Sequence, residues 1–170
     1  MIPANRPPYR ASVSTASMSQ PPQLAPTHLC SVTVTVGPSL APIPLLGGGT
    51  RILQPITGGT IHGHGFNGRI DGGLSAPIHL DTHSSSDGVK AEKTTKIALI
   101  YVYGHTDDGS PFYIEETGIG AVEKQNTRVI IQAGGRYAYL QEAFVLGQPG
   151  KEPGDAFARV ECWIVPLERG

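Results

Sequence analysis

The sharpest chemical signal in the sequence is a pair of histidines, His62 and His64, separated by one residue. Residues two apart on a β-strand point to the same face, so the two imidazoles would lie together. Phe66 and Ile70 follow at the same parity, as on a strand that faces a protein interior. Because an imidazole titrates near neutral pH, His62 and His64 are candidate general acids or bases. The alternative is that they form the polar outer face of a Gly-rich strand.

His28 is the third candidate acid or base. It shares its parity with Cys30, Val32, Val34 and Val36, so it would head an apolar strand face. In that position it is either the polar group of a pocket or a core histidine satisfied by a neighbour.

Tyrosine and arginine side chains offer partners for a substrate carbonyl oxygen. Tyr101 shares a strand face with Ile97 and Leu99, and a buried tyrosine hydroxyl can donate a hydrogen bond to a carbonyl. Arg136 offers a guanidinium for the same task. Tyr101 and Arg136 are therefore the candidate carbonyl-oxygen partners, with core filling by a tethered hydroxyl as the alternative for the tyrosine.

A further group of aromatic and acidic residues is expected to contact a ligand. Glu116 has the parity of Phe112 and Ile114, so its carboxylate would face the interior, unless it lies in solvent at a barrel mouth. The predicted ligand-binding residues are Phe66, Tyr103, Glu116, Tyr139 and Trp163.

Several other kinds of site lack their motifs. A cupin-type metal centre needs a carboxylate soon after the His pair and a third His from a later strand, whereas no acid follows His64 before Asp71 and no His follows His105. We therefore expect no metal and no cofactor, although the alternation of His79, Asp81 and His83 keeps a metal site open as an alternative. The sequence also has no Gly-x-Ser-x-Gly elbow, no phosphate-binding loop and no Rossmann fingerprint.

Composition limits the framework that must position these residues. The chain has 170 residues, enough for one core, and its 22 Gly, 15 Pro and 16% charged residues disfavour a helical bundle or a coiled coil. A net charge of −1 gives no field that would attract nucleic acid or an anionic membrane. No apolar run approaches the roughly 18 residues of a membrane span. We therefore expect a cytoplasmic protein without nucleic-acid or membrane partners.

The chain is expected to divide into an arm and a single domain. Residues 1–25 are rich in Pro and Ser and predict a disordered N-terminal arm, whereas residues 26–170 form the domain. In the absence of a secretion signal, two free buried thiols at Cys30 and Cys162 are favoured over a disulfide between them.

Short segments of alternating polarity separated by turn residues predict about nine strands in this domain. The clearest are 28–36, 60–70 and 94–103, and Asp107-Asp108-Gly109 predicts a hairpin turn. Further strands are expected at 51–57, 78–82, 112–117, 127–132, 137–146 and 157–167. Because closure removes exposed strand edges, we expect an all-β fold, a closed antiparallel barrel of about 8–10 strands like those of calycins and lipocalins. Such an interior holds side chains or one small ligand.

Three blocks of sequence resemble one protein family. They are PITGGTIHGHGFNGRIDGG (residues 55–73), TDDGSPFYIEETGIG (106–120) and RYAYLQEAFVLGQPG (136–150). In this order they are similar to domain-of-unknown-function family 3237, small β-barrel proteins of bacteria and fungi. The resemblance runs from Leu24 to Leu167 and implies the barrel, and the Ser/Pro-rich arm suggests a fungal member serving secondary metabolism. Ser75-Ala76 and Tyr101-Val102 stand where the family commonly has Asp-Trp and Arg-Tyr.

A dry barrel lined with His, Tyr and apolar side chains suits reactions that need only proton transfer and enolate stabilisation. The predicted function is a cofactor-independent isomerase or cyclase acting on a small aromatic or enone polyketide-type metabolite, with a chalcone-isomerase-like ring closure as one candidate. The alternatives are a non-catalytic barrel that carries a hydrophobic metabolite and a metal-dependent cupin-like enzyme. The expected partner is thus a small hydrophobic or aromatic metabolite, and the sequence leaves self-association into a homo-oligomer open.

Overall fold

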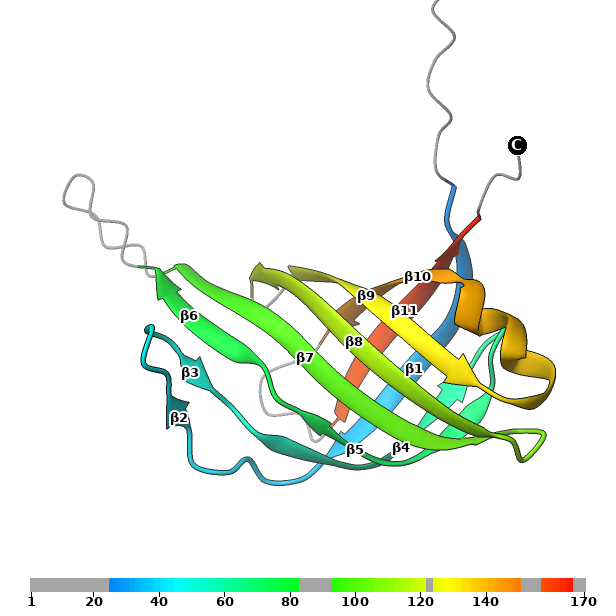
Figure 1. Ribbon diagram of the computed structural model, residues 1–170, viewed down its shortest axis with the longest axis horizontal. Helices are drawn as coiled ribbons and strands as arrows, with labels where there is room; N and C mark the ends of the chain where they lie inside the picture. The colour runs from blue at the N-terminus through cyan, green and yellow to red at the C-terminus, as the bar shows by residue number, and fades with distance from the viewer. Residues whose placement is uncertain (1–24, 83–92, 122–123, 151–156, 167–170) are drawn as a thin grey trace, which may run out of the picture.

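The computed structural model describes residues 25–82, 93–121, 124–150 and 157–166 as a β-structure with one short 3₁₀-helix (Figure 1). The predicted arm, residues 1–25, lies outside the described residues except for its last position. No helix among the described residues is long and apolar enough to cross a membrane. The elements in chain order are β1 (Thr27–Val36), β2 (Ile43–Pro44), β3 (Thr50–Arg51), β4 (Gln54–His62), β5 (Gly68–Ser75), β6 (Ile78–Thr82), β7 (Lys93–Thr106), β8 (Pro111–Ala121), β9 (Lys124–Ala133), η1 (Gly135–Glu142), β10 (Phe144–Gly150) and β11 (Phe157–Val165).

The strands form one antiparallel sheet that closes on itself, which confirms the predicted barrel. Eight strands follow one another around it in the order β7-β5-β4-β1-β11-β10-β9-β8, and the β7–β8 pairing closes the circle. β7 is long enough to pair with β5 through its second half and with β6 through its first half. β6, β3 and β2 thereby extend the sheet beyond the barrel at the end opposite η1 (Figure 1).

Strand alternation decides which side chains enter the barrel. On β1, Val32 and Val34 are buried between half-exposed neighbours, and on β9 Val129 and Ile131 alternate with exposed residues. Removing one such aliphatic side chain completely from water contributes about 1.5–3 kcal/mol. The inward faces of the strands therefore form the hydrophobic core.

The core is densest at the end of the barrel that η1 covers. The buried Phe66 ring stands edge-on to the rings of Phe112 and Tyr137, with centroid separations of 5.5 and 5.1 Å. Leu140, on the same face of η1 as Tyr137, is also buried. These side chains form the floor of the interior.

The prediction of a strand over 137–146 is wrong in its first half. Residues 135–142 form η1, and β10 begins only at Phe144. Gly135 has a φ of 59°, a left-handed conformation that ends the preceding strand and that glycine adopts without steric cost. Side chains three apart on a 3₁₀-helix share a face, which is why Tyr137 and Leu140 both point into the barrel.

The predicted single strand over 60–70 is also wrong, because it consists of two strands and a turn. β4 ends at His62 and β5 begins at Gly68. Within the turn, the Gly63 N–H donates to Asn67 Oδ1 at 3.1 Å, and Asn67 Nδ2 donates to the Gly63 carbonyl at 2.7 Å. The asparagine side chain therefore replaces the strand pairing that would have continued the alternation.

Gly59 allows β1 and β4 to approach each other. A Cβ atom at this position would lie 2.3 Å from the Thr33 carbonyl oxygen and 3.0 Å from Val34 Cα. At neighbouring Gly58 the nearest atom to a Cβ, the Ile70 carbonyl oxygen, is 3.6 Å away, an ordinary contact.

We expect Gly59→Ala to lower the free energy of unfolding by about 1–3 kcal/mol, because β1 must move to admit the methyl group. The matched variant Gly58→Ala should change it by no more than about 0.5 kcal/mol. Urea unfolding followed by circular dichroism measures both. Equal stability of the two variants would show that the close contact between β1 and β4 is not a constraint on the fold.

Candidate functional site

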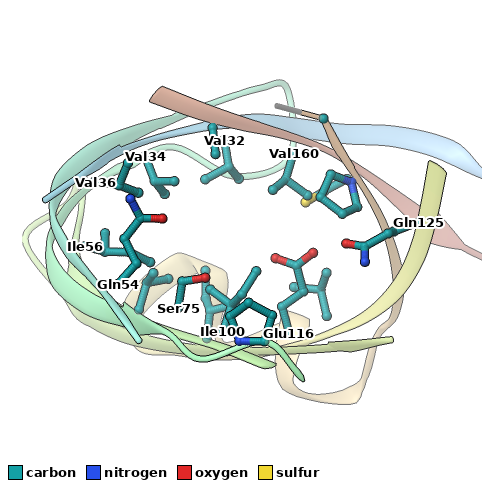
Figure 2. A pocket seen from close by; sticks show the side chains of 18 of the residues that line it. Val32, Val34, Val36, Gln54, Ile56, Ser75, Ile100, Glu116, Gln125 and Val160 are labelled. Carbon is teal, nitrogen blue, oxygen red and sulfur yellow. The ribbon is translucent and has the colours of Figure 1, made fainter. Parts of the chain in front are cut away.

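The barrel encloses a cavity of about 280 Å³ above the aromatic floor (Figure 2). All eight barrel strands contribute to its wall, and most of the lining side chains are apolar, among them Val32, Val34, Ile56, Ile100 and Val160. Ligand pockets in proteins combine such an apolar lining with a few polar groups. The cavity is therefore the candidate functional site.

Glu116 on β8 supplies a carboxyl group that points into this cavity (Figure 2). The residue is only 5% exposed, and its Oε1 accepts a hydrogen bond of 2.7 Å from Thr127 Oγ1. Burial raises the pKa of Glu116, while the Thr127 hydrogen bond and the positive charge of Lys96 act in the opposite direction. The inward position follows the alternation of Phe112, Ile114 and Glu116, as expected from the sequence.

Besides Glu116, the polar residues that line the cavity are Gln54, Ser75, Gln125, His79 and Lys96. Gln125 lies on the same side as Glu116, and its Nε2 donates to the Lys96 carbonyl at 3.3 Å. Gln54 lies on the opposite side, and Ser75 lies between them next to Ile100 (Figure 2). Because Gln54 Nε2 donates to the Gly37 carbonyl at 3.0 Å, the amide oxygen is the end directed into the cavity. A ligand would therefore meet hydrogen-bonding groups on several strands and a mainly apolar surface on β1.

Two free thiols, Cys30 and Cys162, also line the cavity. Both are buried, which confirms the expectation of free buried cysteines. They occupy directly opposed positions on β1 and β11.

His28 does not face the cavity, so the expected strand face is wrong at this position. A β-bulge between His28 and Cys30 shifts the register of β1 against β11 and turns His28 outward. Its side chain is 37% exposed, its Nε2 lies 2.9 Å from Glu161 Oε2, and its ring stands edge-on to Trp163 at a centroid separation of 5.1 Å. Trp163 therefore also lies on the outer face, away from the cavity, in contrast to its predicted role in ligand contact.

His62 and His64 are likewise exposed and outside the cavity. Ile61 is fully buried, so it is Ile61 and not His62 that faces the interior, and the inward face of this strand lies one residue away from the predicted one. The turn that follows β4 then resets the alternation, and Phe66 enters the floor of the cavity without His64. The histidine pair is the polar outer surface that was the alternative interpretation.

The two tyrosines of β7 point outward as well. Ala98, Ile100 and Val102 occupy the inward face, while Tyr101 stacks on Tyr113 outside the barrel at 6.4 Å between ring centroids. Tyr103 is 55% exposed. Since both faces of this strand are apolar, the alternation alone could not determine which face is inside.

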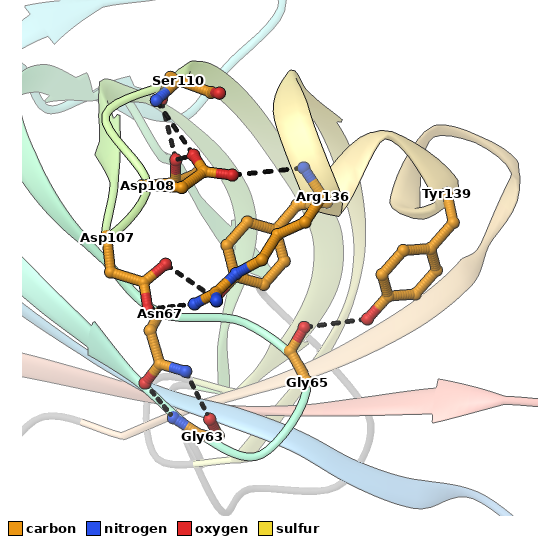
Figure 3. A network of polar contacts seen from close by, with 10 residues as sticks. Gly63, Gly65, Asn67, Asp107, Asp108, Ser110, Arg136 and Tyr139 are labelled. Atoms are coloured by element: carbon orange, nitrogen blue, oxygen red, sulfur yellow. Dashed lines mark hydrogen bonds and ion pairs between the residues drawn. The ribbon is translucent and has the colours of Figure 1, made fainter.

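Arg136 and Tyr139 fasten η1 to the end of the barrel (Figure 3). The Arg136 guanidinium forms an ion pair with Asp107 and donates to the Tyr137 hydroxyl at 2.9 Å. Its backbone N–H donates to Asp108, whose pKa is lowered mainly by hydrogen bonds from Thr106 and Ser110. Tyr139 donates its hydroxyl proton to the Gly65 carbonyl at 2.8 Å. Neither residue reaches the cavity, so their contacts here are structural.

Of the predicted site residues, the structure thus brings only Phe66 and Glu116 to the cavity. Gln54, Ser75 and Gln125 also line the cavity and were not among the predicted site residues. The inward position of Gln125 could have been predicted from the sequence. Gln125, Thr127 and Val129 alternate along β9, and Gln125 lies two residues before the predicted start of that strand at residue 127. Within the described ranges, no three His, Cys, Asp or Glu side chains are grouped so as to hold a metal ion.

Known structures share this fold. A protein with unknown function from Clostridium acetobutylicum superposes with a TM-score of 0.69 at 18% identity, covering 85% of this chain and 100% of its own. A β-barrel-like protein from Acinetobacter baumannii gives 0.69 at 20% identity, with 86% and 98% covered. A structure described as an enzyme from Penicillium herquei gives 0.64 at 23% identity, with 87% and 98% covered.

The family comparison agrees with the resemblance seen in the sequence. Among curated proteins, none matches the chain. Residues 22–136, well over half of the chain, match the family model described as "Protein of unknown function (DUF3237)". On this match and the shared barrel, the chain belongs to the DUF3237 family.

Proposed function

We propose that the protein is a cofactor-independent isomerase or cyclase that acts on a small aromatic or enone-bearing polyketide-type metabolite inside the barrel. The observation that carries the proposal is the buried Glu116 carboxyl directed into an otherwise largely apolar cavity. Buried carboxyls with a raised pKa are frequent at catalytic sites, because a proton donor or base works best when its pKa lies near the operating pH. The barrel described as an enzyme in Penicillium herquei adds support for catalysis on this scaffold.

A ring closure of the chalcone-isomerase type illustrates what this cavity can do. The phenolic O–H of the substrate gives its proton to a base, and the oxygen adds to the β-carbon of a conjugated ketone. The C=C electrons move to the carbonyl as an enolate, which then takes a proton at the α-carbon. All atoms are retained, so the reaction is an isomerisation that requires only proton transfer, orientation and stabilisation of the enolate oxygen.

Glu116 is the group that would transfer the proton. Its raised pKa makes the ionised carboxylate a stronger base and keeps the protonated carboxyl available as a donor at higher pH. Gln125, on the same side of the cavity, carries amide N–H groups suited to an enolate oxygen. His28, His62 and His64, which the sequence suggested for this role, have no access to the same space.

A non-catalytic barrel that carries a hydrophobic metabolite is the second candidate. It is favoured by one observation, the long apolar wall formed by the valines of β1 and by Ile56, Ile100 and Val160. Both candidates require the same cavity and differ only in what happens to the bound molecule.

We expect the protein to cyclise 2′-hydroxychalcone, or another phenol that carries an enone, and Glu116→Gln to lower kcat/KM by about 100-fold or more. The matched control is Glu115→Gln, because Glu115 lies one residue away on the outer face of β8. The loss of enone absorbance measures turnover. Saturable binding of the probe without turnover by the wild-type protein would instead favour the carrier, and turnover unaffected by Glu116→Gln would remove this residue from the mechanism.

The raised pKa of Glu116 also predicts how stability depends on pH. Above its ordinary value near 4.5 the carboxyl is ionised in the unfolded chain but still protonated in the folded protein. The folded state then binds more protons, so the free energy of unfolding falls as pH rises until the folded-state pKa is reached. Each unit of difference between the two pKa values contributes about 1.4 kcal/mol.

Glu116→Gln removes this ionisation, so we expect its stability relative to wild type to increase from pH 4 to pH 8. Urea unfolding at several pH values measures the difference. Glu115→Gln, which removes a carboxyl from the outer face of β8, is the matched control for the substitution itself. A constant difference between Glu116→Gln and wild type would show that burial does not perturb this carboxyl.

A further inference from the structure

We propose that Cys30 and Cys162 are a redox-active pair that closes to a disulfide under oxidising conditions and locks the first strand of the barrel to the last. This inference concerns the cavity wall and does not depend on the proposed enzymatic function. In the structure both residues are free thiols.

The register of the sheet places the two cysteines opposite each other. Cys30 pairs with Cys162 at the start of an uninterrupted antiparallel run that continues to Thr35 and Phe157. Opposed residues in an antiparallel pair have Cα atoms about 4.5–5.5 Å apart, within the roughly 4.4–6.8 Å that a disulfide accepts. The register therefore places the two residues at a separation that a disulfide can span.

Both sulfurs also lie on the same face of the sheet. Cys30 and Cys162 are 1% and 2% exposed, and both line the cavity. The interaction between the two thiols is close enough that Cys30 is the largest cause of the raised pKa of Cys162, ahead of burial. That raised pKa keeps the thiol of Cys162 protonated at neutral pH, which predicts slow oxidation.

The position of the pair gives the bond a large structural effect. β1 and β11 are the first and last strands of the barrel, and the hydrogen bonds between them join the two ends of the domain. A disulfide here would connect residues 132 positions apart (162 minus 30). Because stabilisation by a cross-link grows with the length of the loop that it closes, this is a favourable place for one.

Hydrogen peroxide is small enough to reach sulfurs that line an interior cavity. One thiol loses its proton, and its sulfur attacks the peroxide O–O bond to form a sulfenic acid; the hydroxide that leaves takes up the proton as water. The second thiol then displaces the sulfenic oxygen as a second water and forms the S–S bond. Two thiols and one peroxide thus give one disulfide and two waters, with the sulfurs oxidised by two electrons and the peroxide reduced by two.

The test treats the folded full-length protein with hydrogen peroxide and then alkylates any remaining thiols after unfolding. We expect the mass of the protein to fall by two hydrogens, no alkylation, and a non-reduced peptide that joins Cys30 to Cys162. We also expect the melting temperature to rise on the order of 10 °C, and dithiothreitol added to the unfolded protein to reverse the change.

Cys30→Ser and Cys162→Ser are the matched controls, and neither should gain thermal stability on peroxide treatment. The comparison of oxidised with reduced wild type needs no substitution, so it remains decisive if a serine variant folds poorly. Two alkylatable thiols after treatment, oxygen addition to form sulfinic or sulfonic acids, dimers in place of the internal bond, or an unchanged melting temperature would each overturn the proposal.

Discussion

Closure of the sheet is the constraint on which the rest of the structure depends. β7 pairs with β8 along its length, with Thr95 opposite Ala121 at one end and His105 opposite Pro111 at the other. β1 pairs with β11 where the two ends of the domain meet. Because these two pairings complete the circle, no barrel strand is left with an unpaired edge. Closure also gives each residue one of two environments, the lumen or the outside. A shift of one residue in any strand therefore changes its environment completely.

The cavity is a consequence of how the two halves of the barrel are filled. At one end Phe66, Phe112 and Tyr137 pack ring against ring, and Arg136 holds η1 over them. Beyond that floor the inward residues are mainly valine and isoleucine, whose side chains are too short to meet across an eight-stranded barrel. The fold thus provides a rigid closed end and leaves ligand-sized space above it.

The sequence predicted the fold better than the site, for a reason visible in particular residues. Unbroken alternation gave the correct inward face for Val32 and Val34 and for Glu116. It failed where the backbone changed register locally, at the bulge beside His28 and in the turn after His62. The orientation of Tyr101 was predicted wrongly for a different reason: β7 is apolar on both faces, so alternation does not show which face is inside. Barrel closure follows from the general pattern, whereas the orientation of one side chain depends on single-residue irregularities that the pattern does not contain.

Burial of Glu116 is the part of the structure that folding alone does not explain. A carboxyl in an apolar wall opposes folding, and the hydrogen bond from Thr127 and the positive charge of Lys96 offset part of that cost. Gly147 makes that hydrogen bond possible, because a Cβ there would lie 2.4 Å from Thr127 Oγ1. Residues of three strands, β8, β9 and β10, therefore hold this carboxyl at a fixed point facing the cavity. A buried carboxyl held at a fixed point in a cavity costs stability, and this cost is the reason for proposing a catalytic role for Glu116.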